Sequence, residues 1–349
     1  MMSKFFLEKY NTLDAYVPGE QPQDKKYLKL NTNESPYPPS LRVLDAAFQE
    51  ASRLNLYSDP ECKALTAALA SAFDVAPENV LVTNGSDEAL NFAFMAFCDS
   101  IVFPSVTYGF YPVIANLNGI PYREIPVTPD FRINVDDYIA VNDNIVIANP
   151  NAPTGICLSV ADIEKIVASN PDNIVIIDEA YVDFGAESCV PLTAKYNNLS
   201  VTQTFSKSRS LAGARLGFAI ASSELIADMR TIKDSMNPYN VNRMTMAAGM
   251  AALADNEYYI SNCREIEETR AYTVYDLEDL GFSILPSKAN FLFAKNPGIS
   301  GKDLYLKLKD AGVLVRHFDK PELTDFVRIT IGTRAQMETL IEKIKEVLS

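Results

Sequence analysis

Short, continuously apolar runs recur along the chain as far as about residue 255, separated by segments with helical periodicity. These runs are Val80–Val82, Ile101–Phe103, Ile145–Ala148, Ile174–Ile177, Leu199–Val201 and Gly217–Ile220. Strands that are buried on both faces have such runs, whereas strands with one solvated face alternate between apolar and polar residues. The pattern predicts an α/β fold with a mainly parallel, mixed sheet between two layers of helices.

The pattern changes in the last third of the chain. A long charged helix is predicted over 258–280, followed by strands near Ile284, 290–293, 313–315 and 326–329. The final helix is predicted to begin at Thr333, where Thr-Arg-Ala-Gln is a capping box. We therefore expect three parts: a proline-rich N-terminal arm (1–40) that packs with the small domain and the site, a large domain (41–255) and a smaller α+β domain (256–349).

Composition narrows the function classes. The 349 residues carry a formal net charge of −14, which disfavours nucleic acid and anionic membranes as partners. The five cysteines include no Cys-x-x-Cys pair, and a single histidine argues against a histidine-based metal site, so no metal is predicted. The N-terminal apolar patch is too short for a signal peptide, and no stretch is long enough to span a bilayer. We expect a cytoplasmic protein.

The candidate chemistry centres on Lys207 and Asp178. Lys207 lies among hydroxyl side chains in Thr204-Phe205-Ser206-Lys207-Ser208, and Asp178 ends the apolar run 174–177. A lysine amine can form a Schiff base, and a buried carboxylate can pair with a protonated pyridine nitrogen. Tyr181 could then donate to the oxygen on that ring. Simpler alternatives stay open, namely a solvated lysine and an aspartate that caps the next segment or pairs with an arginine.

A second motif predicts an anion site. In Val82-Thr83-Asn84-Gly85-Ser86-Asp87 a strand turns through glycine into a helix, whose free N–H groups and dipole favour an anion. Thr204, Ser206 and Arg215 would complete a phosphate clamp. Alternatively, Ser86 or Asp87 serves only to cap the helix.

Taken in order, the motifs resemble those of the fold-type I, pyridoxal 5'-phosphate-dependent aminotransferases, and among these the histidinol-phosphate aminotransferases. The resemblance covers the chain from about Tyr16 to the C-terminus, and it is carried by Gly85-Ser86-Asp87-Glu88, Asn149-Pro150-Asn151-Ala152-Pro153-Thr154-Gly155, Asp178-Glu179-Ala180-Tyr181, Ser206-Lys207 with Arg215, and Val327-Arg328-Ile329-Thr330-Ile331-Gly332-Thr333. It implies the fold-type I architecture and a transamination with glutamate or 2-oxoglutarate and a phosphorylated amine in histidine biosynthesis.

The resemblance also assigns residues to roles. Lys207, Asp178 and Tyr181 are the implied catalytic residues. The cofactor-binding residues would be Gly85, Ser86, Asp87, Tyr108, Asn151, Asp178, Tyr181, Thr204, Ser206, Lys207 and Arg215, with Tyr57 reaching the cofactor of the neighbouring subunit in a homodimer. The substrate-binding residues would be Tyr16, Asn33, Arg316 and Arg328, with Arg328 on the α-carboxylate and Arg316 on the phosphate end.

One departure stands out, because Ala152 occupies a position where the family often has asparagine; Asn151 is expected to take over the ring-oxygen contact. Three other functions remain open. A threonine-phosphate decarboxylase has nearly the same motifs, a broad or aromatic aminotransferase has the same chemistry, and a cofactor-binding regulatory domain would lack catalysis.

Overall fold

A computed structural model describes residues 3–11 and 13–349. The helices are α1 (Leu41–Ala51), α2 (Lys63–Phe73), α3 (Ser86–Phe97), α4 (Tyr111–Asn118), α5 (Val160–Ser169), α6 (Ser223–Met236), α7 (Arg243–Ala254), α8 (Asn256–Asp279), α9 (Gly301–Asp310) and α10 (Arg334–Leu348). The strands are β1 (Leu28–Lys29), β2 (Val80–Thr83), β3 (Ile101–Pro104), β4 (Tyr122–Ile125), β5 (Asn144–Ala148), β6 (Val175–Asp178), β7 (Leu199–Thr204), β8 (Gly217–Ala221), β9 (Ser283–Ile284), β10 (Phe291–Lys295), β11 (Val313–Leu314), β12 (Arg316–His317) and β13 (Val327–Thr330).

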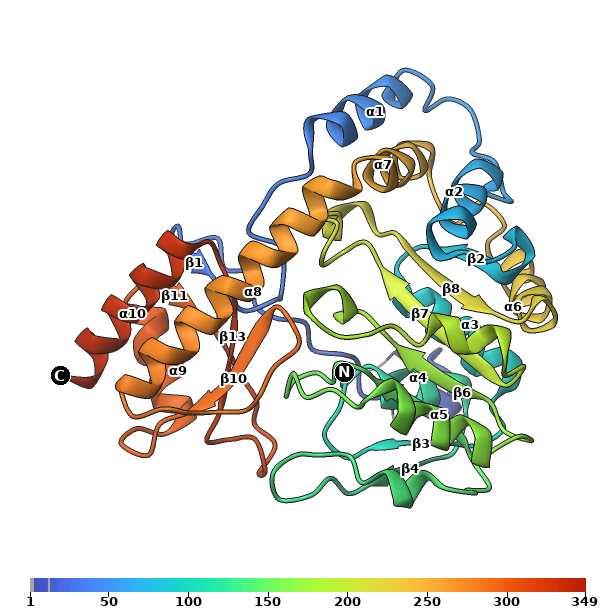
Figure 1. The fold of residues 1–349 in the computed structure, drawn as a ribbon. Coiled ribbons are helices and arrows are strands. Elements are labelled where there is room, and N and C mark those ends of the chain that lie inside the picture. The colour runs from blue at the N-terminus through green and yellow to red at the C-terminus, as the bar shows by residue number, and fades with distance from the viewer. Residues whose placement is uncertain (1–2, 12) are drawn as a thin grey trace.

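The large sheet has the strand order β2-β8-β7-β6-β5-β3-β4 (Figure 1). Only β8 runs antiparallel to its neighbours, β2 and β7. Each of the six apolar runs in the sequence forms one of these strands, which confirms the predicted mixed, mainly parallel sheet. The seventh strand, β4, was not predicted, because it lies at the sheet edge and three of its four residues are exposed.

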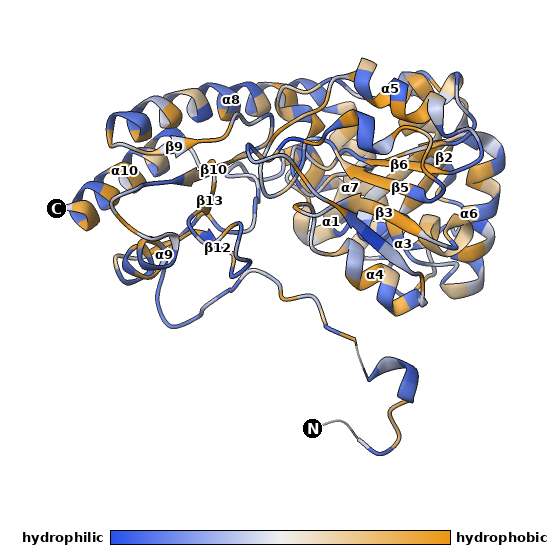
Figure 2. Ribbon diagram, turned by 90° about the horizontal axis from the view of Figure 1, so that it is seen from below, coloured by the Kyte–Doolittle hydropathy of each residue, from blue (hydrophilic) through white to orange (hydrophobic). Residues whose placement is uncertain are grey.

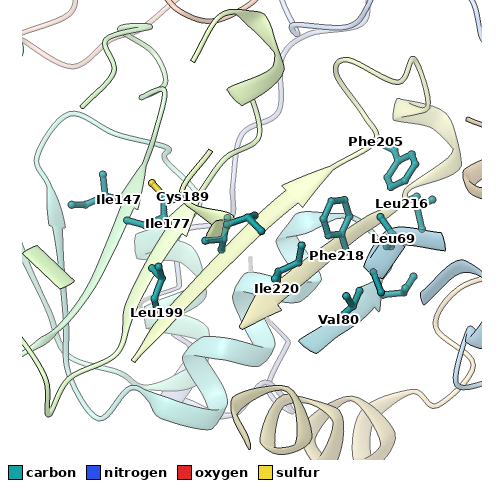
Figure 3. Close-up of a cluster of buried hydrophobic side chains, with 14 of the residues drawn as sticks. Leu69, Val80, Ile147, Ile177, Cys189, Leu199, Phe205, Leu216, Phe218 and Ile220 are labelled. Carbon is teal, nitrogen blue, oxygen red and sulfur yellow. The ribbon is translucent and has the colours of Figure 1, made fainter. Parts of the chain in front are cut away.

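Both faces of this sheet are covered, so successive strand residues enter different cores. Helices α2, α5 and α7 pack on one face, where Val80, Ile147 and Ile177 belong to the cluster drawn in Figure 3. Helices α3, α4 and α6 cover the other face and pack on Leu81 and Val146. Burial of each large apolar side chain contributes about 1.5–3 kcal/mol, so this double layer holds the strand ends in fixed positions.

A second, antiparallel sheet has the order β12-β13-β10-β9 and packs with α8, α9 and α10 (Figure 1). The predicted charged helix is α8, which extends from the helices of the large sheet to the small one. The capping box at Thr333 is confirmed, since its side chain accepts from the Gln336 N–H and the Gln336 side chain accepts from the Thr333 N–H. The domain boundaries at residues 40 and 255 stay predictions.

The N-terminal segment leaves the body of the molecule as an extended arm (Figure 2). Further along, β1 pairs in parallel with β11, Leu28 opposite Val313, and this separate two-stranded sheet attaches the arm to the part of the chain just before β12. Residues 31–34 then pass between the two sheets and line the cavity described below. No helix in the described part of the chain is long and apolar enough to cross a membrane.

Candidate active site

A cavity of about 390 Å³ lies where the carboxyl ends of the large sheet's strands face the small sheet and the arm. In open α/β sheets ligands bind at this end of the strands. The cavity brings together most of the predicted site residues, namely Tyr16, Asn33, Ser86, Asp87, Tyr108, Asp178, Tyr181, Thr204, Ser206, Lys207, Arg215, Arg316 and Arg328. Gly85, Asn151 and Tyr57 do not line it.

Lys207 is placed in the cavity by the loop that follows β7. Its Nζ lies 5.6 Å from the centroid of the Tyr181 ring and 3.5 Å from the backbone oxygen of Thr32. The amine makes no salt bridge to a carboxylate of the described residues. It is only partly buried, which leaves it accessible to a ligand in the cavity.

The N-terminus of α3 forms the anion end of the cavity. Gly85 is the N-cap residue of α3, with φ of 81°, and no side chain of the described residues caps the helix. The alternative in which Ser86 or Asp87 caps the helix is therefore wrong. The positive φ favours glycine here, because residues with a Cβ rarely adopt it, and a Cβ on Gly85 would also lie 2.6 Å from Nη2 of Arg215. Arg215 itself pairs with Asp87 at 3.3 Å. The first N–H groups of the helix and one guanidinium therefore converge on the same space.

The hydroxyls of Thr204 and Ser206 lie beside this anion end. Thr204 Oγ1 donates to Ser206 Oγ over 2.9 Å, and both residues are buried. Thr204 Oγ1 also accepts from the Ser206 N–H, so the loop is fixed before it reaches Lys207.

Asp178, the last residue of β6, is buried, with 4% of its surface exposed. Its Oδ2 accepts from the Tyr111 hydroxyl over 2.9 Å, and its Oδ1 accepts from the Ala180 N–H over 3.1 Å. Burial raises the pKa of the Asp178 carboxyl to about 6, since these two hydrogen bonds only partly offset the lost hydration. No arginine or lysine of the described residues forms a salt bridge with Asp178.

Tyr111 was missed by the sequence analysis. It begins α4, its side chain is fully buried, and it contacts the cavity-lining Asp178 without lining the cavity itself. Nothing in Tyr-Gly-Phe-Tyr separates a core tyrosine from one that contacts a carboxylate, because Asp178 lies 67 residues away in the chain. Only the packing of α4 against the sheet brings the two together.

Tyr181 and Asn33 are hydrogen-bonded to each other. The Asn33 Nδ2 donates to the Tyr181 hydroxyl over 3.0 Å, and Asn33 Oδ1 accepts from the Thr330 hydroxyl over 3.0 Å. Asn33 had been assigned to the substrate. The structure adds a protein contact that the sequence did not reveal, and the substrate contact stays a prediction.

Aromatic residues form another wall. The Tyr108 hydroxyl donates to Asp87 over 3.1 Å, and Tyr16 lies edge-on to Tyr108 with ring centroids 6.1 Å apart. Burial raises the pKa of both phenols, that of Tyr108 well above its usual value. Both side chains are therefore neutral hydrogen-bonding surfaces at neutral pH. Tyr16 comes from the arm and is still 41% exposed.

Two arginines from the small sheet complete the site. Arg328 Nη2 donates to the Asn31 oxygen over 3.1 Å, while its Nε is buried without a partner in the described residues. Burial lowers the pKa of Arg328. Arg316 donates to the Val17 and Pro18 oxygens, each over 3.2 Å. A partly buried guanidinium whose buried Nε has an unused donor is suited to an anionic ligand.

Phe318 connects these arginines and was also missed by the sequence analysis. The guanidinium carbons of Arg316 and Arg328 both lie 5.5 Å from the centroid of its ring, and Phe318 lines the cavity. Stacking of this kind holds a guanidinium plane in place.

The structure corrects the prediction for Asn151. Its Nδ2 donates to the Val106 oxygen over 2.9 Å and to Thr154 Oγ1 over 3.0 Å, and its Oδ1 accepts from Thr107. The side chain is thus occupied in holding the loop, outside the cavity. It is the methyl group of Ala152 that lines the cavity at this position, so Asn151 does not replace the missing asparagine.

Tyr57 lies away from the cavity of its own chain. It is 80% exposed and stacks on Tyr239 with ring centroids 4.6 Å apart. The predicted contact with a neighbouring subunit's site stays a prediction.

Comparisons with known proteins agree on the family. The sequence model of the aminotransferase class I and II family matches residues 25–344. A histidinol-phosphate aminotransferase of Brachyspira hyodysenteriae is 47% identical over 352 residues, which cover 99% of each chain.

Solved structures of similar proteins agree on the fold. A putative histidinol-phosphate aminotransferase of Erwinia carotovora atroseptica superposes with a TM-score of 0.86 at 28% identity, covering 95% of this chain and 98% of the other. The histidinol-phosphate aminotransferase of Sinorhizobium meliloti, solved in complex with pyridoxal-5'-phosphate, has a TM-score of 0.89 at 24% identity, covering 99% and 98%.

Proposed function

Because the chain belongs to the class I and II aminotransferases, and within them to the histidinol-phosphate aminotransferase family, we propose that it interconverts L-histidinol phosphate plus 2-oxoglutarate with imidazole-acetol phosphate plus L-glutamate, a step of histidine biosynthesis. The observation that carries the proposal is the cavity itself. It joins a lysine amine, a buried carboxylate that makes no salt bridge within residues 3–11 and 13–349, and two guanidinium groups.

The cofactor of these aminotransferases is pyridoxal 5'-phosphate, and the residues fit it. The buried Asp178 carboxylate would hold a protonated ring nitrogen, because an unpaired buried carboxylate is costly. The N-terminus of α3, Ser86, Ser206 and Arg215 would hold the phosphate. When bound, the cofactor supplies an electron sink for the electrons released at the substrate's α-carbon.

The chain's own residues supply the proton transfers. Lys207 Nζ would take a proton from the substrate's α-carbon as a general base and then carry that proton as a general acid. The Tyr181 hydroxyl, which accepts a hydrogen bond from Asn33 Nδ2, would donate a hydrogen bond to the ring oxygen. Tyr108 covers the ring, and Tyr16 from the arm covers the site and limits the access of water.

The two arginines account for the substrates in this proposal. Arg328 holds the α-carboxylate of glutamate, and Arg316 holds the phosphate end of histidinol phosphate. Phe318 stacks on both, so the two guanidinium groups keep a fixed separation. A small substrate with an anion at one end fits a site that has fixed cations in an otherwise acidic protein.

The proposal is tested with the purified, cofactor-loaded protein. We expect glutamate to form from histidinol phosphate and 2-oxoglutarate, with no carbon dioxide released from threonine phosphate. Carbon dioxide release would favour the decarboxylase instead. Turnover of phenylalanine or tyrosine with a kcat/KM equal to that of histidinol phosphate would favour a broad or aromatic aminotransferase.

The proposed assembly is a homodimer in which Tyr57 reaches the partner's site. Large apolar side chains of α1 and of the segment after it support this, since Leu41 is 79% and Phe48 80% exposed, beside the exposed Tyr57. Apolar patches of this kind mark protein–protein interfaces. We also place the enzyme in the cytoplasm, for which the five unpaired cysteines are the support.

A further inference from the structure

Asn33 occupies a central position between the arm, the small sheet and the cavity. Only 1% of its surface is exposed, and its φ of 56° places it in the left-handed region. Asparagine tolerates this conformation better than most residues, and glycine adopts it without strain. The backbone of Asn33 is fixed on both sides, since its N–H donates to Thr330 Oγ1 over 2.9 Å and its oxygen accepts from Asn290 Nδ2 over 3.0 Å.

These contacts determine which way the Asn33 amide faces. The Thr330 hydroxyl accepts from the Asn33 backbone N–H, so its own proton is directed to Asn33 Oδ1. The Nδ2 group must then face Tyr181, to which it donates over 3.0 Å. The orientation of an amide is best assigned from such a network.

Tyr181 therefore accepts a hydrogen bond from Asn33 and keeps its own proton for a ligand. Its ring packs against Ala152, Ala289 and Phe291, which are apolar, and it bonds to no other polar side chain of the described residues. Lys207 lies over the ring, and Arg328, Tyr16 and Tyr108 are the other titratable groups near it among the described residues. A hydrogen bond accepted by a hydroxyl polarises its O–H and strengthens the bond that the hydroxyl donates.

We propose that Asn33 is a positioning residue that polarises the Tyr181 hydroxyl and aims its proton at the ring oxygen of the bound cofactor. This inference rests on the proposed function, in which Tyr181 donates to that oxygen. The side chain of Ala152 has no polar group that could contact the ring oxygen. The strength of the hydrogen bond that the Tyr181 hydroxyl donates therefore depends on Asn33.

The same short segment also contacts the other two functional groups. The Asn31 oxygen accepts from Arg328, and the Thr32 oxygen approaches Lys207 Nζ. Thr330, which orients Asn33, lies two residues after Arg328 in β13. Residues 31–33 thus fix the position of the Tyr181 hydroxyl relative to Arg328, the arginine that would bind the substrate's anion.

The test uses Asn33→Gly and Asn33→Asp, each loaded with pyridoxal 5'-phosphate. Glycine keeps the backbone conformation and removes the donor. Aspartate keeps the shape, but it accepts the Tyr181 proton and so withdraws that proton from the ring oxygen. The pH at which the absorbance of the bound cofactor changes should rise by about half a unit in the first variant and by about one unit or more in the second.

We expect kcat to fall about 3–10-fold in Asn33→Gly and further in Asn33→Asp, with a smaller change in the KM of glutamate. Asn296→Asp is the matched control, because the Asn296 side chain hydrogen-bonds, among the described residues, only to the Leu280 oxygen and the Gly298 N–H and does not line the cavity. Its absorbance midpoint should equal that of the wild type. If Asn33→Gly does not fold, the isosteric Asn33→Asp carries the test alone.

Two results would overturn the inference. One is an absorbance midpoint that is the same in wild type and in the folded Asn33 variants, and the other is an equal shift in Asn296→Asp. Both leave the proposed function intact if the wild-type absorbance responds to glutamate. A wild type without that response overturns the proposed function and this inference together.

Discussion

The Tyr111 hydroxyl donates a hydrogen bond over 2.9 Å to the Asp178 carboxylate, at a point where both side chains are buried. This bond favours the ionised form of an aspartate whose pKa burial raises to about 6. It therefore helps to keep Asp178 charged at neutral pH, which is the state needed to pair with a protonated ring nitrogen.

Replacement of Tyr111 by phenylalanine should raise the pKa of Asp178 further. A hydrogen bond to a charged group contributes about 1.5–3 kcal/mol, so we expect kcat/KM at pH 7 to fall about 10-fold and the acidic limb of its pH profile to move to higher pH. Tyr138→Phe is the matched control, because Tyr138 is buried in the same domain and its hydroxyl has no partner among the described residues. An unchanged acidic limb in Tyr111→Phe would contradict this role.

The cofactor-free protein should show the cost of the buried Asp178 carboxylate. Its pKa is raised from 3.8 in the unfolded chain to about 6 in the fold, so its favourable contribution is fully present below about pH 4 and is lost as the pH rises through 6. Asp178→Asn removes this titration. Urea unfolding from pH 4 to 8 should therefore show wild type losing stability relative to Asp178→Asn as the pH rises, and a constant difference would refute the assignment.

Lys207→Ala should lower kcat by at least about 10²–10⁴-fold, the range expected for loss of a general acid–base group. Borohydride treatment of the loaded wild type, followed by peptide mapping, should place the cofactor label on Lys207. The exposed Lys165, which pairs with Asp162, provides the control substitution and should leave kcat unchanged. A label on another lysine would contradict the proposed chemistry.

Substitution of Arg328 and of Arg316 should raise the KM of different substrates. Arg328→Gln removes a partly buried guanidinium, and we expect the KM of glutamate to rise about 100-fold, since loss of a desolvated charge pair with the substrate costs about 2–5 kcal/mol. Arg316 is less buried than Arg328. Arg316→Gln should therefore raise the KM of histidinol phosphate about 10-fold, with a smaller rise in the KM of glutamate. Equal effects of both variants on both substrates would reject the division of roles.

The proposed dimer can be tested by complementation between two inactive variants. Tyr57→Ala and Lys207→Ala homodimers should each have low activity, whereas a mixture refolded together should recover part of it. In the hybrid, one site combines Lys207 of one protomer with Tyr57 of the other and is complete. Absence of recovery, although hybrids form, would place Tyr57 outside the partner's site.

The sequence sufficed for features that depend on local composition. The runs at 145–148 and 174–177 became β5 and β6 because a strand buried on both faces must be apolar throughout. The capping box at Thr333 is a contact between residues three apart, so the sequence alone specifies it. The motif around Lys207 and the glycine turn at Gly85 likewise carried the family, which the comparisons confirmed.

Tertiary structure decided how those motifs meet. The contacts of Asp178 with Tyr111 and of Tyr181 with Asn33 join residues 67 and 148 positions apart, and no local pattern records such distances. The motif around Asn151 suggested a contact with the ligand. In the folded protein its amide instead donates to the Val106 oxygen and to Thr154 Oγ1, which no local pattern predicted. The reason is physical: periodicity and propensity act within a few residues, whereas the direction of a buried polar side chain depends on which partners the packed elements bring to it.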